Sequence, residues 1–209
     1  MRQLLAILVA TLVASPAGAA DLALSLATPG GKPLANAVVT VYPASGAPRG
    51  PIRFPWPYMM SQKDMQFEPY VLVVPVGAEV AFPNRDPFKH HVFSFSPAKT
   101  FELKLYGRDE QRSVKFDKPG VVALGCNIHD DMTAFIKVVD TPFAAKTDAK
   151  GEAVVRDLPP GDAQVVVWQP FLKGPRNEVS RSVKAPASGS FALAVTAEAR
   201  TPPLRRGGY

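Results

Sequence analysis

The residues best suited to chemistry in this sequence lie in one short segment, Cys126-Asn-Ile-His129-Asp-Asp-Met132. The segment supplies a thiolate, an imidazole and a thioether. Soft sulfur ligands together with imidazole suit copper, and a cysteine with two histidines and a distant axial methionine is the ligand set of blue-copper sites. The segment provides only one of the two histidines that such a site requires.

A second histidine is available upstream, in Asn84-Arg-Asp-Pro-Phe-Lys-His90-His91. The chain has one cysteine and three histidines, and all four fall within these two segments. Any one of them alone would more often be an ordinary core or solvated residue, but their joint placement favours a single metal site. Zinc fits less well, because a thioether is a poor zinc ligand and a three-ligand zinc site needs a substrate pocket. We therefore predict one copper ion, cycling between Cu(I) and Cu(II).

The two segments, their spacing and the strand expected after each resemble the cupredoxins, in particular the plastocyanin- and amicyanin-like blue copper proteins of periplasmic methylamine-utilisation systems. The resemblance covers roughly residues 67–139. It implies a thiolate ligand, a buried histidine anchor, a histidine that faces the partner and a weak axial thioether. In this sequence those copper ligands are Cys126, His90, His129 and Met132. The resemblance and the apolar pattern also indicate a shell around the site, formed by Phe82, Phe88, Val92, Ile128 and Phe135.

Residues outside the ligand set follow the family pattern only in part. The resemblance implies that Asn84 holds the ligand loop through hydrogen bonds, and it places His91 where the family has an asparagine that pins the same loop. If His91 were the ligand instead of His90, strand alternation would direct His90 outward. The family surrounds its loop histidine with prolines and apolar residues, whereas Asp130 and Asp131 follow it here. An acidic rim is expected to select a basic partner.

The function implied by the resemblance is one-electron transfer between periplasmic redox partners, with a redox protein or enzyme as electron donor or acceptor. An enzyme is not expected, because multicopper oxidases and copper nitrite reductases need further histidines and the chain has no Gly-x-Ser-x-Gly nucleophile motif. The alternative is a periplasmic carrier or buffer for copper delivery, since Met59, Met60 and Met65 could bind Cu(I) through thioethers. A third possibility is an interaction module whose copper site is secondary.

The elements that must position these residues are β-strands. The chain contains 22 prolines and 15 glycines, and short Val- and Phe-rich runs alternate with turn residues. This pattern predicts an all-β protein, and the resemblance implies a Greek-key cupredoxin β-sandwich. The expected strands are Leu22–Leu26, Ala37–Tyr42, Tyr70–Val74, Glu79–Phe82, His91–Phe95, Phe101–Leu105, Ser113–Phe116, Gly120–Leu124, Thr133–Val139, Gly151–Arg156, Asp162–Trp168 and Ser190–Thr196.

The segments on either side of the copper region resemble the two halves of a small prealbumin-like sandwich of the carboxypeptidase-regulatory type. We therefore predict that residues 21–57 and 141–199 form this second β-sandwich together. Residues 58–140 would then be a cupredoxin-like copper domain inserted into one of its loops, where insertions are well tolerated. One continuous sandwich is the alternative organisation.

The ends of the chain predict export and a disordered tail. Residues 1–20 have a basic residue, a short apolar run and small residues, which is typical of a cleaved signal peptide and implies a periplasmic protein. No later apolar run is long enough to span a membrane. The net charge is +6, but basic residues are scattered without interleaved aromatics, so nucleic acid is not an expected partner. Residues 200–209 are expected to be disordered.

Overall fold

The computed structural model describes residues 18–108 and 110–202, which form β-strands and one short 3-10 helix, η1 (Pro175–Asn177). The predicted all-β class is confirmed. Within the described residues, no helix is long and apolar enough to cross a membrane. The strands are β1 (Ala20–Ala27), β2 (Val38–Pro43), β3 (Ser61–Lys63), β4 (Gln66–Glu68), β5 (Val71–Pro75), β6 (Ala78–Pro83), β7 (His90–Ser96), β8 (Lys99–Tyr106), β9 (Gln111–Phe116), β10 (Gly120–Cys126), β11 (His129–Val139), β12 (Ala144–Lys146), β13 (Glu152–Leu158), β14 (Gly161–Trp168), β15 (Glu178–Ala185) and β16 (Gly189–Thr196).

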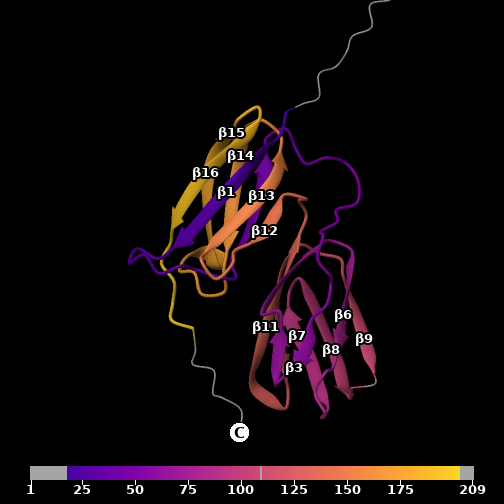
Figure 1. Cartoon of the computed structure of the whole chain (residues 1–209). Coiled ribbons are helices and arrows are strands. Elements are labelled where there is room, and N and C mark those ends of the chain that lie inside the picture. The colour runs from indigo at the N-terminus through magenta and orange to yellow at the C-terminus, as the bar shows by residue number, and fades with distance from the viewer. Residues whose placement is uncertain (1–17, 109, 203–209) are drawn as a thin grey trace, which may run out of the picture.

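Strands from the two ends of the described chain form one pair of sheets, which we call the flanking sandwich (Figure 1). One sheet has the order β13-β1-β16 and the other the order β12-β2-β14-β15. Strand β1 alternates buried and less buried residues, so that Leu22, Leu24 and Leu26 face the core between the sheets. The core of this sandwich is made from residues before position 42 and after position 142.

The strands between β2 and β12 form a second pair of layers, which we call the middle sandwich (Figure 1). Its larger sheet has the order β5-β11-β10-β7-β8. The opposing layer consists of the β6–β9 and β3–β4 pairs, which are joined by the parallel bridges Met59–Ala81 and Gln62–Asn84. Phe82 and Phe116 are fully buried between the layers. All three strands that carry candidate ligands, β7, β10 and β11, therefore lie inside the sheet rather than at its edges.

The two sandwiches meet at a junction built around Trp168, the largest of the fully buried side chains. The edge of its ring meets Phe135 at 5.7 Å between centroids, and Lys137 Nζ lies 5.7 Å from the Trp168 ring. The same ammonium group pairs with Glu178 at 3.0 Å, and both side chains are largely buried. Apolar packing and a largely buried ion pair thus coincide where the two sandwiches meet.

The chain leaves and re-enters the flanking sandwich at neighbouring points. Val41 N–H donates to the carbonyl of Phe143 at 2.8 Å, and Thr141 Oγ1 donates to the carbonyl of Val41 at 2.8 Å. The Tyr42 hydroxyl also donates to Asp140 at 3.0 Å. The ends of the middle sandwich are therefore tied together by hydrogen bonds of the flanking sandwich.

Several boundaries differ from those expected. Strands β3, β4, β12 and β15 were not predicted, and β11 begins at His129 rather than at Thr133. The expected signal peptide lies outside the described residues except for its last positions, where Ala20 is already buried in β1. Arg200, expected in a disordered tail, is hydrogen-bonded through its backbone to Phe171 and through its side chain to Asn177. Residues 203–209 of that expected tail lie outside the described residues.

Candidate metal centre

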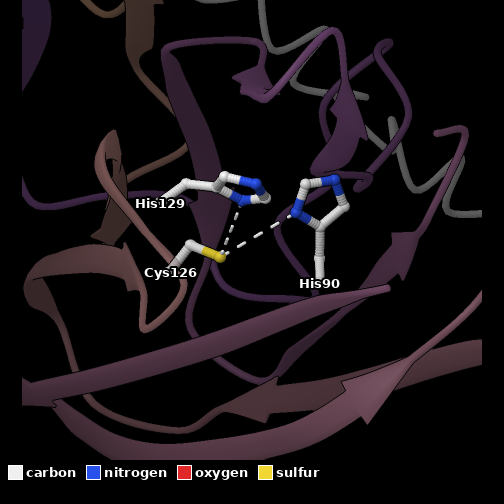
Figure 2. Close-up of side chains that lie close together, drawn as sticks. All are labelled: His90, Cys126 and His129. Atoms are coloured by element: carbon white, nitrogen blue, oxygen red, sulfur yellow. Dashed lines mark hydrogen bonds between the residues drawn. The ribbon is translucent and has the colours of Figure 1, made fainter. Parts of the chain in front are cut away.

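Cys126 and His129 face each other across the tight turn between β10 and β11. They are cross-strand partners, whereas the preceding residue, Gly125, pairs with Thr133. This shift of register inserts extra residues into β11, which is a β-bulge. The bulge lets the turn contain only Asn127 and Ile128, so the cysteine and the histidine project toward the same point (Figure 2).

The third member of the cluster is His90, the first residue of β7. Its ring is fully buried, and its Nδ1 lies 3.8 Å from Cys126 Sγ. His129 Nδ1 lies 3.7 Å from the same sulfur (Figure 2). The three potential ligand atoms all lie within 4.8 Å of one another. The structure thus brings together one thiol sulfur and two imidazole nitrogens from segments far apart in the sequence.

Met132, the fourth predicted ligand, lies on β11 three positions after His129. It is fully buried, and it belongs to the same apolar core cluster as Cys126. Its thioether is therefore placed in the apolar interior of the middle sandwich rather than in solvent.

An aromatic ring covers the outer side of the cluster. The Phe88 ring lies 5.2 Å from the His90 ring and 5.7 Å from the His129 ring, and the two imidazoles are 5.0 Å apart. Phe88 and Ile128 are both exposed, which makes the rim around half-buried His129 partly apolar. Phe135 was expected in the apolar shell around the site, but it lies elsewhere. Its ring packs on Trp168 and Tyr70 at the junction.

The polar contacts of the cluster favour an ionised thiol. Burial raises the pKa of Cys126, but hydrogen bonds from His90, from the backbone N–H groups of His91 and Ile128, and from His129 outweigh burial and bring the pKa to about 6. Burial also lowers the pKa of His90, yet its contacts with Cys126 and Asp86 outweigh burial and raise it. A thiolate is the form of cysteine that binds metals.

We expect the metal-free protein to show this ionisation directly. The ultraviolet absorbance of the thiolate should appear with a midpoint near pH 6, far below the ordinary value of 9.0 for cysteine, because the donors around Cys126 stabilise the anion. Subtracting the titration of a Cys126→Ser variant isolates this signal from the tyrosines. A midpoint above pH 8 would contradict the arrangement of donors around the sulfur.

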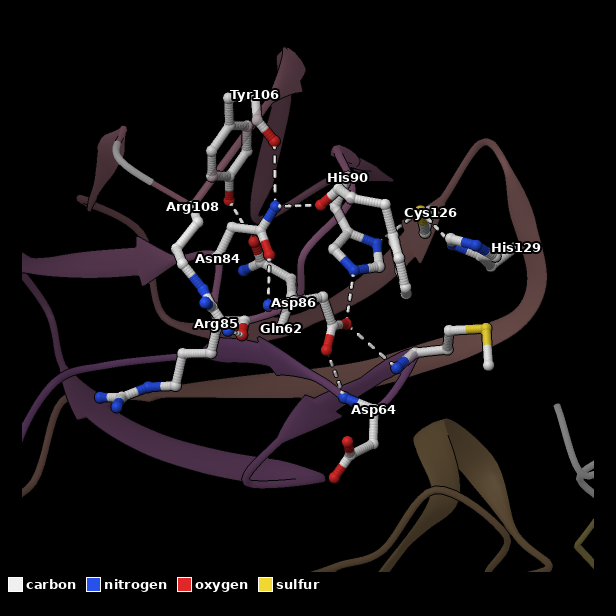
Figure 3. A network of polar contacts seen from close by, with 12 residues as sticks. Gln62, Asp64, Asn84, Arg85, Asp86, His90, Tyr106, Arg108, Cys126 and His129 are labelled. Atoms are coloured by element: carbon white, nitrogen blue, oxygen red, sulfur yellow. Dashed lines mark hydrogen bonds and ion pairs between the residues drawn. The ribbon is translucent and has the colours of Figure 1, made fainter.

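Asn84 holds the segment that carries His90, and His91 contacts both β8 and the Cys126 sulfur. Asn84 Nδ2 donates to the carbonyls of Phe88 at 2.7 Å and Tyr106 at 3.1 Å, so it fixes the segment that carries His90 (Figure 3). His91 directs its Nε2 to Glu102 on β8 at 2.8 Å, while its backbone N–H contacts the Cys126 sulfur. Its Nδ1 is buried without a hydrogen-bond partner among the described residues.

Sequence reasoning missed one residue of the site, Asp86. Its Oδ2 lies 2.7 Å from His90 Nε2, and both side chains are buried. The signal was present in the sequence, because a carboxylate precedes His90 by four positions. Nothing in that spacing alone distinguishes a buried partner from a solvated aspartate, since the segment is a loop rather than a helix.

The donor set fits a copper ion. Cys126 provides a thiolate, and His90 and His129 each direct Nδ1 toward it. The other ring nitrogen of His90 is bonded to a carboxylate, as is usual for metal-binding histidines. A thiolate and two imidazoles, with the buried thioether of Met132 in the same core cluster as Cys126, match the preferences of copper better than those of zinc.

Comparisons with known proteins gave similarities only to solved structures, and those reported below have TM-scores under 0.5. No protein-family model and no curated protein sequence matches. A Cu-containing nitrite reductase from Thermus scotoductus SA-01 is 28% identical over 47% of this chain and 25% of that chain, with a TM-score of 0.39. A purple cupredoxin from Nitrosopumilus maritimus is 20% identical over 39% of this chain and 96% of that chain (TM-score 0.35). A reduced Cu(I) amicyanin variant is 20% identical over 50% of this chain and 99% of that chain, with a TM-score of 0.37. This chain thus spans only a quarter of the nitrite reductase.

Proposed function

We propose that this protein is an exported one-electron carrier that binds one copper ion through His90, Cys126, His129 and Met132. The observation that carries the proposal is the convergence of Cys126 Sγ with Nδ1 of His90 and of His129, all within 4.8 Å. Among the described residues, this is the only group of three His, Cys, Asp or Glu side chains whose ligand atoms lie close enough together to hold a metal ion.

Each residue of the centre has a distinct task in this function. Bound copper would supply reversible one-electron exchange between Cu(I) and Cu(II). His90 is buried and held by Asp86, so it keeps its position in both oxidation states. Half-buried His129 lies beside exposed Phe88 and Ile128, where an apolar partner surface could exclude water. The ring edge of His129 is therefore the point of electron entry and exit.

The cellular setting belongs to the same proposal. Residues 1–20 have the composition of a signal peptide, which supports a periplasmic location and a periplasmic redox protein or enzyme as partner. The domain organisation that we propose is a copper domain, residues 58–140, inserted into the prealbumin-like sandwich of residues 21–57 and 141–199. The composition of the sheets and cores supports it.

The test is the visible and electron paramagnetic resonance spectrum of the protein after addition of stoichiometric Cu(II). We expect an intense thiolate-to-copper band, because Cys126 is held as a thiolate next to two imidazoles, and we expect its loss in Cys126→Ala. Reversible reduction of the same sample establishes electron exchange. Binding of Cu(I) alone, without a thiolate band and unaffected by Cys126→Ala, would reject the proposal and favour copper delivery through methionines.

A further inference from the structure

We propose that Asp86 is a positioning residue that orients the His90 ring and makes Cu(II) more stable relative to Cu(I), which lowers the reduction potential of the centre. The inference rests on the proposed copper site. It adds a residue outside the ligand set that tunes the site through a buried carboxylate rather than through a metal bond.

The Asp86 carboxylate is enclosed by donors on both oxygens. Oδ1 accepts from the backbone N–H of Asp64 at 2.7 Å, and Oδ2 accepts from the backbone N–H of Met65 at 3.1 Å and lies 2.7 Å from His90 Nε2 (Figure 3). The Asp86 side chain is only 5% exposed. Its own backbone N–H donates to Asn84 Oδ1 at 2.9 Å, which fixes the main chain beneath it.

The two backbone N–H groups that donate to the Asp86 carboxylate belong to the turn between β3 and β4. Asp64 and Met65 join β3 to β4 with φ values of 52° and 55°, a left-handed conformation that a methionine rarely adopts. The hairpin is tied to the rest of the site by Gln62, which accepts the Tyr106 hydroxyl at 2.6 Å and the Arg85 N–H at 2.8 Å. The β3–β4 hairpin therefore supplies a fixed pair of amides that require an acceptor at Asp86.

This enclosure determines which nitrogen of His90 is free. A carboxylate that already receives two amide protons acts as an acceptor toward His90, so Nε2 carries a proton and donates it. In the neutral imidazole, the form that binds a metal ion, the lone pair of the ring then lies on Nδ1, which faces Cys126 Sγ at 3.8 Å. A negative charge hydrogen-bonded to the outer edge of a ligand makes that ligand more basic and stabilises the more highly charged metal ion. Asp86 is therefore expected to favour Cu(II).

The test compares the reduction potential and the Cu(II) affinity of the copper-loaded protein with those of Asp86→Asn. Loss of an outer-shell partner typically weakens metal binding about 10- to 100-fold. If this loss falls on Cu(II), the potential rises by about 60 to 120 mV, since a tenfold change corresponds to about 59 mV for one electron. The matched control is Glu102→Gln, which removes the carboxylate bonded to the neighbouring His91 and should leave both quantities unchanged.

The outcomes separate this inference from the proposed function. A wild-type protein without a thiolate-to-copper band overturns the copper site and the inference together. A normal band in both proteins with an unchanged potential overturns the role of Asp86 alone, as does an equal shift in Glu102→Gln. If Asp86→Asn fails to fold, the same comparison is made in a Met65→Gly background, because glycine adopts positive φ readily and stabilises the hairpin.

Discussion

His90→Ala is expected to lose the thiolate-to-copper band and to bind Cu(II) at least about 100-fold more weakly than the wild type, more than the loss typical of an outer-shell residue. The His90 ring is fully buried, its Nδ1 faces the Cys126 sulfur, and its Nε2 is held by Asp86. Alanine removes the ligand atom and leaves no other imidazole at that place. Titration with Cu(II), followed by visible absorbance, measures both effects.

His91→Ala is the matched control for this prediction. The two histidines are adjacent in the sequence, but the His91 side chain contacts Glu102 at the exposed edge strand β8. Only the backbone N–H of His91 reaches the Cys126 sulfur, and alanine retains that group. The band should persist, with Cu(II) affinity reduced by less than about tenfold, below the usual loss for an outer-shell partner. A band that survives His90→Ala and disappears in His91→Ala would reverse the ligand assignment.

Trp168→Ala is expected to lower the free energy of unfolding by about 3–5 kcal/mol, the usual cost of removing a buried tryptophan. Trp168 fills the junction between the sandwiches, where it contacts Phe135 and lies beneath Lys137. The substitution opens a cavity and leaves the Lys137–Glu178 pair without its aromatic neighbour. Urea unfolding, followed by circular dichroism, measures the change.

The comparison for Trp168 is Phe95→Ala, which removes an aromatic ring that is 80% exposed. That variant should change stability by less than about 0.5 kcal/mol, as surface substitutions usually do. The copper spectrum of folded Trp168→Ala should resemble that of the wild type, because the junction is built from residues outside the copper ligands. A loss of stability below 1 kcal/mol would mean that the junction contributes little to holding the sandwiches together.

The fold class could be predicted from the sequence because apolar alternation marks strands that bury one face. All twelve expected strands are present, although their limits shift by a few residues. The missed strands lack that signal. β15 is largely polar and exposed and is held by backbone pairing with β14 along its whole length. The β3–β4 hairpin turns at Asp64-Met65, which is not one of the Asn-Gly or Asp-Gly pairs that predict such turns.

The candidate ligands were predicted for a different reason, namely that rare residue types with metal-binding chemistry were concentrated in two segments. The sequence contained no comparable signal for their surroundings. The carboxylate beside His90 depends on a turn formed more than twenty positions upstream, and the partner of His91 lies on the next strand. Such contacts arise from tertiary packing, which residue spacing does not report. Phe135 was misplaced because its face of β11 covers the junction rather than the ligands.

The meeting of Val41 with Phe143 has a consequence for the order in which the chain folds. Strands β1 and β2 pair with β13, β14 and β16, so the flanking sandwich must close a loop of about a hundred residues. Each doubling of a flexible loop costs about 0.6 kcal/mol of closure entropy. A middle sandwich that is already folded holds both ends together and replaces that long loop by linkers of about twenty residues in total, which saves the flanking strands about 1.4 kcal/mol. Folding of the middle sandwich thus lowers the entropy cost of pairing the flanking strands. Unfolding of the middle sandwich restores that cost and destabilises the flanking sandwich.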